Sequence, residues 1–276
     1  MIPASFDYVR ATSADEALAL LAEHGDDAKL LAGGHSLLPL MKLRLASPSV
    51  VIDVGRLQEL SYVRDGGDHV AVGALTRHCD IQRSALLLAD VPLIPHVAGL
   101  VGDPQVRHRG TIGGSIAHGD AASDLPAAAL ALSATLVVRG PRGTREIPAA
   151  DFFRGFLETA IAPDELLAEI RLPKMGGAGW SYQKFNRRAQ DWAIVGVAAV
   201  GVAAGGGVAL VNMAATPVRA SAVEQAVAGG AAAGEAASAA SAGLDPPADL
   251  NASSEFRRHL ATVLVRRALE EVQRAP

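Results

Sequence analysis

Two short glycine-rich motifs are the residues of this sequence best suited to bind a ligand. The first is Ala32-Gly33-Gly34-His35-Ser36 and the second is Thr111-Ile112-Gly113-Gly114-Ser115. Glycines lack a Cβ, so a paired-glycine backbone can turn sharply and successive N–H groups can converge on an anion. One such turn is weak evidence. Two of similar composition predict a ligand with two phosphates, or a pyrophosphate held from both sides.

Other kinds of nucleotide or metal site find little support. No G-x-G-x-x-G motif follows a predicted strand and there is no Walker A motif, which argues against Rossmann and P-loop binding. The single cysteine, Cys79, cannot form an internal disulfide, and alone it cannot ligate an iron–sulfur cluster or a structural zinc. His118, Asp120 and Asp124 have the spacing H-x-D-x-x-x-D, but a turn and a helix cap explain them more simply than a metal site does.

Three side chains beside the glycine motifs leave alternatives open. Arg107 and Arg109 precede the second motif and are either solvated or partners of a phosphate. His35 lies within the first motif and could be taken for a catalytic residue. A structural role for its backbone, with a local hydrogen bond of its side chain, is the simpler expectation.

The composition is that of a globular protein without a nucleic-acid function. Of the 276 residues, 50% are hydrophobic and 20% are charged, and the net charge is −4, so no strongly basic face is expected. A single cysteine is compatible with a cytoplasmic setting, and residues 1–7 lack the basic-then-apolar pattern of a signal peptide. We therefore expect a cytoplasmic protein long enough to form two or three packed units.

Residues 193–213 contain no charge and are long enough to span a membrane. They consist mainly of Val, Ala and Gly, and β-branched runs at 194–202 and 208–211 flank a turn at Gly205-Gly206-Gly207. This pattern favours a buried hairpin over a transmembrane helix, so no transmembrane segment is expected.

Local signals predict the elements that would hold the first motif in place. Ser13 is a good N-cap with Glu16 three residues later, and Gly25 is a good stop, so a helix is expected between them. A strand at 28–32 then leads into the glycine turn, and a helix interrupted by Pro39 follows. The other expected elements are a strand at 50–54, a hairpin at 59–72, helices at 79–88, 92–101 and 127–133, strands at 134–139, 145–147, 166–172 and 180–185, a loose Ala-, Gly- and Ser-rich segment at 229–243, and a helix at 253–274.

Four segments together resemble the FAD-binding medium subunit of the molybdenum hydroxylases, above all the aerobic carbon monoxide dehydrogenase type. They are AGGHSLLPLMKLRL at 32–45, VRHRGTIGGSIAHGDAASDLPA at 106–127, AATPVRASAVEQAVAG at 214–229 and SSEFRRHLATVLVRRAL at 253–269. The resemblance covers essentially the whole chain in order, and the two glycine motifs together are quite specific.

This resemblance implies an α+β fold of the vanillyl-alcohol-oxidase or PCMH type, in which two subdomains hold FAD. A C-terminal α+β domain, similar to that of the CO dehydrogenase flavoprotein, would pack beside them. We expect the subdomains at 1–55 and 56–174 and the C-terminal domain at 178–276, with the glycine-rich stretch at 174–179 as the linker.

The resemblance also implies FAD contacts for particular residues. Residues 32–36 would give backbone N–H groups to the diphosphate, and residues 111–115 would form the opposing loop. Both would act as anion-binding nests. Further donors would be the hydroxyls of Ser36, Thr111 and Ser115.

Four more residues are implied as FAD contacts. Lys29 would lie near the adenine or phosphate side, Asp124 would be a polar anchor, and Lys184 would lie on a strand that contacts the flavin. Trp192 stands where the family often has an aromatic residue, commonly Tyr, that shields the isoalloxazine face. The wider Trp should still stack but would change solvent access. Residues 118–120 read HGD where the family commonly has HAD, which implies a looser loop.

The resemblance implies an electron-transfer role. Substrate would be oxidised at molybdenum in a molybdopterin-binding large subunit. Electrons would pass through a small subunit with two [2Fe–2S] clusters to this FAD, and on to quinone, dioxygen, NAD or another acceptor. The expected assembly is a heterotrimer of these subunits, usually doubled. The lack of an evident nucleophile–base pair agrees with this role, because a flavin carries the redox chemistry itself.

Two alternatives to the electron-transfer role remain open. One is a stand-alone FAD-dependent oxidoreductase of the same fold that acts directly on a small molecule. The other is a scaffold that has lost FAD, and the intact glycine motifs argue against it.

Overall fold

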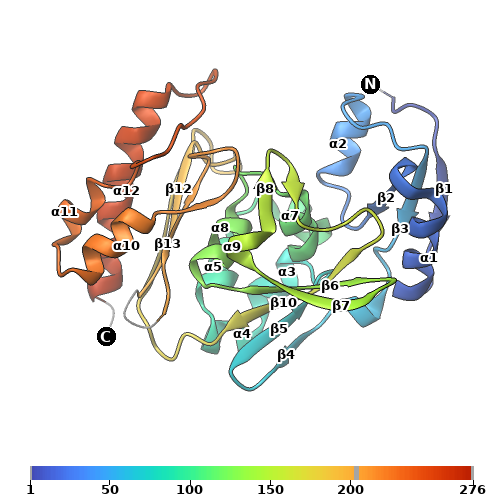
Figure 1. Ribbon diagram of the computed structural model, residues 1–276, viewed down its shortest axis with the longest axis horizontal. Coiled ribbons are helices and arrows are strands. Elements are labelled where there is room, and N and C mark those ends of the chain that lie inside the picture. Colours follow the sequence, from blue (N-terminus) through green and yellow to red (C-terminus); the bar gives the residue numbers. More distant parts are fainter. Residues whose placement is uncertain (1, 202–204, 275–276) are drawn as a thin grey trace.

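Three groups of elements follow one another along the chain in a computed structural model that describes residues 2–201 and 205–274 (Figure 1). The N-terminal group, coloured blue, and the C-terminal group, coloured orange and red, lie at opposite ends of the molecule. A five-stranded sheet with its helices lies between them. Each group has its own cluster of buried apolar side chains.

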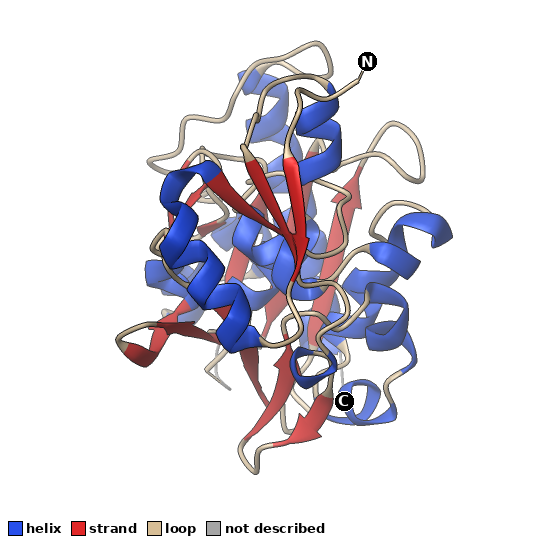
Figure 2. Cartoon of the chain, turned by 90° about the vertical axis from the view of Figure 1, so that its right-hand side faces the viewer, coloured by secondary structure: helices blue, strands red, loops and turns tan. Residues whose placement is uncertain are grey.

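The N-terminal group is a small parallel sheet in the order β1-β3-β2. Helix α1 begins where the Ser13 hydroxyl accepts a hydrogen bond from the N–H of Glu16, and it ends at Gly25, whose φ is 55°, as its capping residues predict. Figure 2 views the chain from this side, with the short strands in front of the longer central ones. The elements are β1 (Asp7–Arg10), α1 (Ala14–His24), η1 (Gly25–Asp27), β2 (Ala28–Leu31), α2 (Leu37–Lys42), β3 (Val50–Asp53) and η2 (Gln58–Leu60).

The central sheet is antiparallel in the order β4-β5-β10-β6-β7, and helices cover one of its faces. Its strands are β4 (Val63–Asp65), β5 (His69–Gly73), β6 (Thr135–Gly140), β7 (Gly143–Pro148) and β10 (Leu166–Pro173). The helices are α3 (His78–Arg83), α4 (Ala85–Asp90), α5 (Leu93–Gly99), α6 (Pro104–Arg109), α7 (Ile112–His118), α8 (Asp124–Ala131) and α9 (Ala149–Phe152). A two-stranded ribbon of β8 (Phe153–Gly155) and β9 (Glu158–Thr159) completes this group.

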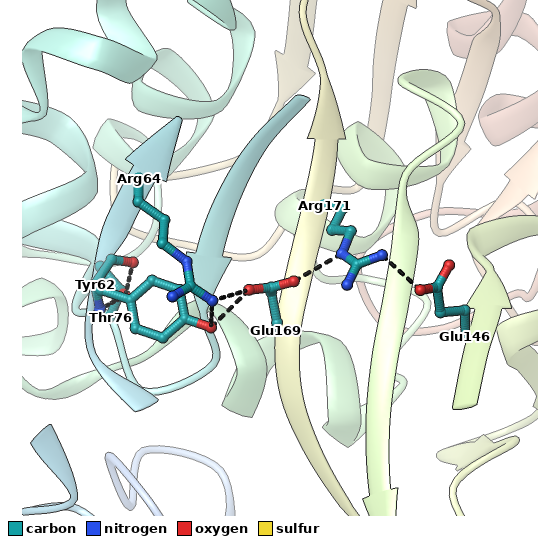
Figure 3. A network of polar contacts seen from close by, with 6 residues as sticks. All are labelled: Tyr62, Arg64, Thr76, Glu146, Glu169 and Arg171. Carbon is teal, nitrogen blue, oxygen red and sulfur yellow. Dashed lines mark hydrogen bonds and ion pairs between the residues drawn. The ribbon is translucent and has the colours of Figure 1, made fainter. Parts of the chain in front are cut away.

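The other face of the central sheet carries a polar network (Figure 3). Along β10, Ile170 and Leu172 point into the helix-covered core, so the alternating residues Glu169 and Arg171 point the other way. Glu169 accepts hydrogen bonds from the Tyr62 hydroxyl at 2.7 Å, from Arg64 at 2.9 Å and from Arg171 at 2.7 Å. These bonds link β10 to β4 and to the residue before β4, across the intervening strand β5.

The C-terminal sheet, in the order β11-β12-β13-β14, is buried on both faces. Alternate residues of β12 pack against the central helices on one side and against the C-terminal helices on the other. This two-sided burial accounts for the continuous apolar run, and the predicted hairpin is confirmed as β12 paired antiparallel with β13. Residues 202–204 of that hairpin lie outside the described residues. The elements are β11 (Trp180–Phe185), β12 (Val195–Val200), β13 (Val208–Val211), β14 (Val218–Arg219), α10 (Ser221–Ala228), α11 (Ala233–Ala237) and α12 (Ser254–Arg274).

Two local predictions were wrong. The helix expected at 79–88 is two helices, α3 and α4, separated at Ser84, whose hydroxyl caps α4 by accepting from the N–H of Leu87. The segment at 229–243 is not loose, because α11 packs its alanines into the C-terminal core beside α12. Small side chains allow the backbones of α11 and α12 to approach each other closely. A segment without bulky residues can therefore still be well packed.

Candidate functional site

A cavity of about 620 Å³ lies where the three groups of elements meet. Its volume is in the range of small-molecule and cofactor sites. All but one of the residues predicted to bind a cofactor line it: Lys29, Ala32, Gly33, Gly34, His35, Ser36, Thr111, Gly113, Gly114, Ser115, Asp124, Lys184 and Trp192. The exception is Ile112, whose side chain is buried in the central core. The fold therefore gathers residues from distant parts of the sequence around one cavity.

The first glycine motif forms an open turn between β2 and α2. Gly34 has a φ of 80°, in the left-handed region that favours glycine. In the part of the chain that the structure describes, no protein acceptor pairs with the backbone N–H groups from Gly33 to Leu37. Buried or half-buried N–H groups are rarely left without a hydrogen-bond acceptor. These donors are therefore available to bind an anion.

The second glycine motif is not a turn but the start of helix α7. The Thr111 hydroxyl caps the helix by accepting from the N–H of Gly114 at 3.1 Å. The N–H groups of Ile112, Gly113 and Ser115 are also paired, with Thr76, Ala74 and Thr111 carbonyls respectively. This arrangement corrects the expectation of a second free nest. What the second motif can still offer a ligand is side-chain chemistry, chiefly the Ser115 hydroxyl.

The two motifs lie directly against each other. A Cβ on Gly33 would collide with the carbonyl oxygen of Arg109 and would lie 2.9 Å from Cα of Gly110. Arg77 lies far from both motifs in the sequence. Its guanidinium donates to the same Arg109 carbonyl and, at 3.2 Å, to the carbonyl of Gly55. This guanidinium therefore ties the N-terminal group to the segment that leads into α7.

Asp124 and Lys184 form a buried ion pair at one end of the cavity. Lys184 Nζ lies 2.8 Å from Asp124 Oδ2, and the two side chains are 7% and 6% exposed. The other carboxylate oxygen accepts from the Tyr182 hydroxyl at 2.5 Å, and Lys184 also donates to the carbonyl of Leu100 at 3.1 Å. Burial raises the pKa of Asp124 despite its bond to Lys184, and burial likewise raises the pKa of Tyr182 well above its ordinary value.

The remaining predicted residues are open to solvent at the cavity wall. Trp192 is 56% exposed, beside Gln190 and Asp191 in the segment between β11 and β12. Lys29, on β2, and His35 are exposed as well. A large aromatic face that lines a cavity without being covered by protein can stack on a planar ligand.

The residues with open alternatives have other partners. Arg107 donates to the carbonyls of Val101 and Gly102, at 3.0 and 3.1 Å. The Asp120 carboxylate accepts from the N–H of Ala122 at 2.8 Å, two residues on, in a local turn. Among the residues that the structure describes, no three His, Cys, Asp or Glu side chains gather as a metal site would require.

Sequence reasoning missed two residues near the glycine motifs: His78, which lines this cavity, and Arg77, which contacts the segment before the second motif. Both lie some thirty residues before the second motif and have no motif of their own. The only available signal was a basic dipeptide after the strand β5. His78 is 1% exposed and lines the cavity, with its Nε2 3.3 Å from the hydroxyl of Ser115.

No helix in residues 2–201 and 205–274 is long and apolar enough to cross a membrane. The uncharged stretch that raised this question lies in the strands β12 and β13 instead.

Comparison with known proteins identifies the family. Residues 4–175 match the FAD binding domain in molybdopterin dehydrogenase, and residues 180–272 match the CO dehydrogenase flavoprotein C-terminal domain. The chain is 48% identical over 199 residues to the carbon monoxide dehydrogenase medium chain of Hydrogenophaga pseudoflava, covering 72% of this chain and 69% of that one. It is 40% identical over 281 residues to the glyceraldehyde dehydrogenase medium chain of Sulfolobus acidocaldarius, covering 99% and 100%.

A solved structure supports the same assignment. Carbon monoxide dehydrogenase from Hydrogenophaga pseudoflava, in a form that lacks the Mo-pyranopterin moiety of the molybdenum cofactor, matches with a TM-score of 0.94 at 42% identity over 99% of both chains. The predicted α+β fold class and the predicted cofactor, FAD, are thereby confirmed. The chain belongs to the FAD-binding medium subunits of the molybdenum hydroxylases, a family of oxidoreductases.

Proposed function

We propose that this chain is the electron-transfer subunit of a molybdenum hydroxylase, which passes electrons from [2Fe–2S] clusters of a partner subunit to an external acceptor. When bound, FAD supplies the redox chemistry, since it exchanges electrons with both one- and two-electron partners. The chain's own residues bind and orient the cofactor. The observation that carries the proposal is the cavity in which the open first motif faces the hydroxyls of the second.

The cavity fits FAD in charge as well as in volume. The diphosphate is an anion that only accepts hydrogen bonds, and the N–H groups from Gly33 to Leu37 are donors without protein partners among the described residues. We assign the diphosphate to this turn, with the hydroxyls of Ser36 and Ser115 as added donors. The other residues of the two motifs, 32–36 and 111–115, shape the wall around it.

The two ends of the cavity differ, and this difference orients the cofactor. Lys29 lies at one end, on β2, where Leu21 of α1 and Val54, just after β3, also line the wall, and we assign this end to the adenosine. Asp124, Lys184 and Trp192 lie at the other end, which we assign to the isoalloxazine ring. Trp192 offers the ring a stacking face, and the paired charges offer it polar contacts.

Three apolar cores support the proposed domains at 1–55, 56–174 and 178–276 in outline, although Leu166 also packs in the N-terminal core and Ala198 in the central one. The proposed partners are a molybdopterin-binding large subunit and a [2Fe–2S] small subunit, in a heterotrimer that is usually doubled. Relatives named for carbon monoxide and for glyceraldehyde share this subunit type. We infer that the large subunit sets the substrate and that this chain does not.

A reduction experiment separates the electron-transfer subunit from a stand-alone oxidoreductase. The flavin absorbance of the purified chain and of the assembled three-subunit complex is followed after substrate is added without an acceptor. The proposal predicts bleaching of the flavin in the complex and none in the chain alone. Bleaching of the isolated chain by the same substrate would favour the stand-alone enzyme, and an oxidised flavin beside reduced clusters would contradict the proposed route.

A further inference from the structure

His78 is a buried histidine in the wall of the cavity. It is the first residue of α3, is 1% exposed, and its backbone N–H donates to the carbonyl of Gly110 at 3.1 Å. A Cβ on Gly110 would lie 2.7 Å from Cδ2 of the imidazole, so the absence of a side chain at Gly110 makes room for the ring. The ring is therefore fixed relative to the residues that begin α7.

The two ring nitrogens of His78 have unequal surroundings. Nε2 lies 3.3 Å from the Ser115 hydroxyl, whereas the buried Nδ1 has no hydrogen-bond partner among the described residues. Burying a polar atom without a partner costs free energy. Since Nδ1 has no partner, Nε2 is the ring nitrogen through which His78 can act on a neighbouring residue.

The imidazole is neutral near pH 7. Burial, followed by electrostatic repulsion from nearby basic side chains, Arg107 first, lowers the pKa of His78 to about 4. A neutral imidazole carries one N–H, so its Nε2 either donates to Ser115 or accepts from it.

The ligand decides between these two possibilities. A serine hydroxyl has a single proton to donate, and a phosphate oxygen can only accept. If Ser115 donated to His78, it would turn lone pairs toward the anion and repel it. No donor other than His78 reaches Ser115 Oγ among the described residues. The hydroxyl can therefore keep its bond to His78 and still donate into the cavity only if Nε2 carries the imidazole proton.

We propose that His78 is a positioning residue for the cofactor: its Nε2–H donates to Ser115 Oγ and thereby directs the Ser115 hydroxyl proton at the FAD diphosphate. This inference rests on the proposed placement of the diphosphate. It gives the second glycine motif a specific function, because the N–H groups of Ile112 to Ser115 are already paired within the protein.

A double-mutant cycle tests the coupling through FAD affinity, measured on the full chain by flavin fluorescence. His78→Phe keeps a flat ring without a donor and should weaken FAD binding about tenfold, the size expected for one oriented hydrogen bond to an anion. His78→Gln keeps a donor at the Nε2 position and should bind within about threefold of wild type. Ser115→Ala should cost as much as His78→Phe, and adding His78→Phe to it should cost little more.

The outcomes distinguish this inference from the proposed site. If Ser115→Ala weakens binding and His78→Phe does not, or if the two effects add fully, His78 does not act through Ser115 and the inference is wrong. If neither Ser115→Ala nor a substitution in the first motif changes FAD affinity, the proposed diphosphate site itself is wrong.

A second measurement reads the tautomer in the wild-type chain and uses a variant only to assign the signal. Nitrogen-15 NMR of the labelled histidine side chains reports which ring nitrogen carries the proton, and the His78→Gln spectrum identifies the signal among the eight histidines. With FAD bound, we expect protonated Nε2 and unprotonated Nδ1. The opposite tautomer in the FAD-bound chain would overturn the inference.

Discussion

Gly33 and Arg109 lie in contact, although Gly33 belongs to the first motif and Arg109 to the segment that leads into the second, in a different group of elements. A side chain on Gly33 has no room, because its Cβ would collide with the Arg109 carbonyl oxygen. The backbone of the first motif is thus packed on the entry to the second. This contact sets the spacing of the two walls that the cofactor must bridge.

Gly33→Ala should therefore weaken FAD binding and destabilise the chain by about 1–3 kcal/mol, the usual cost of overpacking. Gly234→Ala is the matched control, since a Cβ there meets only Arg266 Cδ at 3.8 Å and Gly234 lines no part of the cavity. FAD titration and urea unfolding of both variants check this. Equal effects of the two substitutions would show that the Gly33 contact is not special.

The ion pair of Asp124 and Lys184 should behave as a coupled unit. Asp124→Ala leaves a buried ammonium and the Tyr182 hydroxyl without their partner, and should cost about 3–5 kcal/mol of stability. The double variant Asp124→Ala/Lys184→Met should recover part of that loss, because it removes the uncompensated charge. Denaturant unfolding of the two single variants and the double variant measures the coupling. If the losses of stability in the two single variants simply add in the double variant, the two side chains are not coupled as a buried ion pair.

Acid should destabilise the chain through Glu165 and Glu169. The Arg145 hydrogen bond lowers the pKa of Glu165. For Glu169, burial acts to raise the pKa, but hydrogen bonds from Arg171, Tyr62 and Arg64 outweigh it, so the pKa is lowered. A carboxyl with a lowered folded-state pKa stabilises fully above its unfolded pKa, near 4.3, and loses that contribution as the pH falls through the folded value.

The expected result is a steep loss of stability below about pH 4.5. Glu165→Gln and Glu169→Gln should each be less stable at pH 7 and show a shallower acid slope, measured by thermal unfolding across pH. If the dependence of stability on acid pH is unchanged in both variants, these two carboxylates do not cause the loss of stability in acid.

Trp192 should report flavin binding by fluorescence. Only two tryptophans are present. Trp180 packs against His96 in a tilted arrangement with ring centroids 5.2 Å apart, away from the lining of the cavity. In Trp180→Phe, which leaves Trp192 as the sole emitter, FAD should quench most of the tryptophan emission. In Trp192→Phe, the remaining emission should change much less. Equal quenching in the two variants would place the flavin elsewhere.

The sequence predicted those parts of the fold that depend on neighbouring residues. The Ser13 cap, the Gly25 stop and the hairpin of β12 and β13 follow from local patterns and are confirmed. The second motif was predicted as a turn because paired glycines let the backbone turn sharply. Contacts from the residues that follow β5, such as Gly113 N–H to the Ala74 carbonyl, stabilise α7 there instead.

The same distinction applies to the site. Both glycine motifs were visible because their residues are consecutive. The partners of Asp124 lie about sixty residues away, and His78 lies 37 residues before Ser115. These pairings depend on how β5, α3, α7 and β11 are brought together, and no spacing in the sequence encodes them. Arg77 was missed for the same reason.

The most direct test of the central claim is the flavin absorbance of the purified full chain after FAD is added and unbound FAD is removed by gel filtration. Gly114→Trp would fill the cavity beside Ala32, and Gly234→Trp, at an exposed position whose Cβ meets only Arg266 at 3.8 Å, is the matched control. The account predicts bound flavin in the wild type and in Gly234→Trp, and none in Gly114→Trp. Normal flavin content in Gly114→Trp would contradict the placement of FAD between the two motifs.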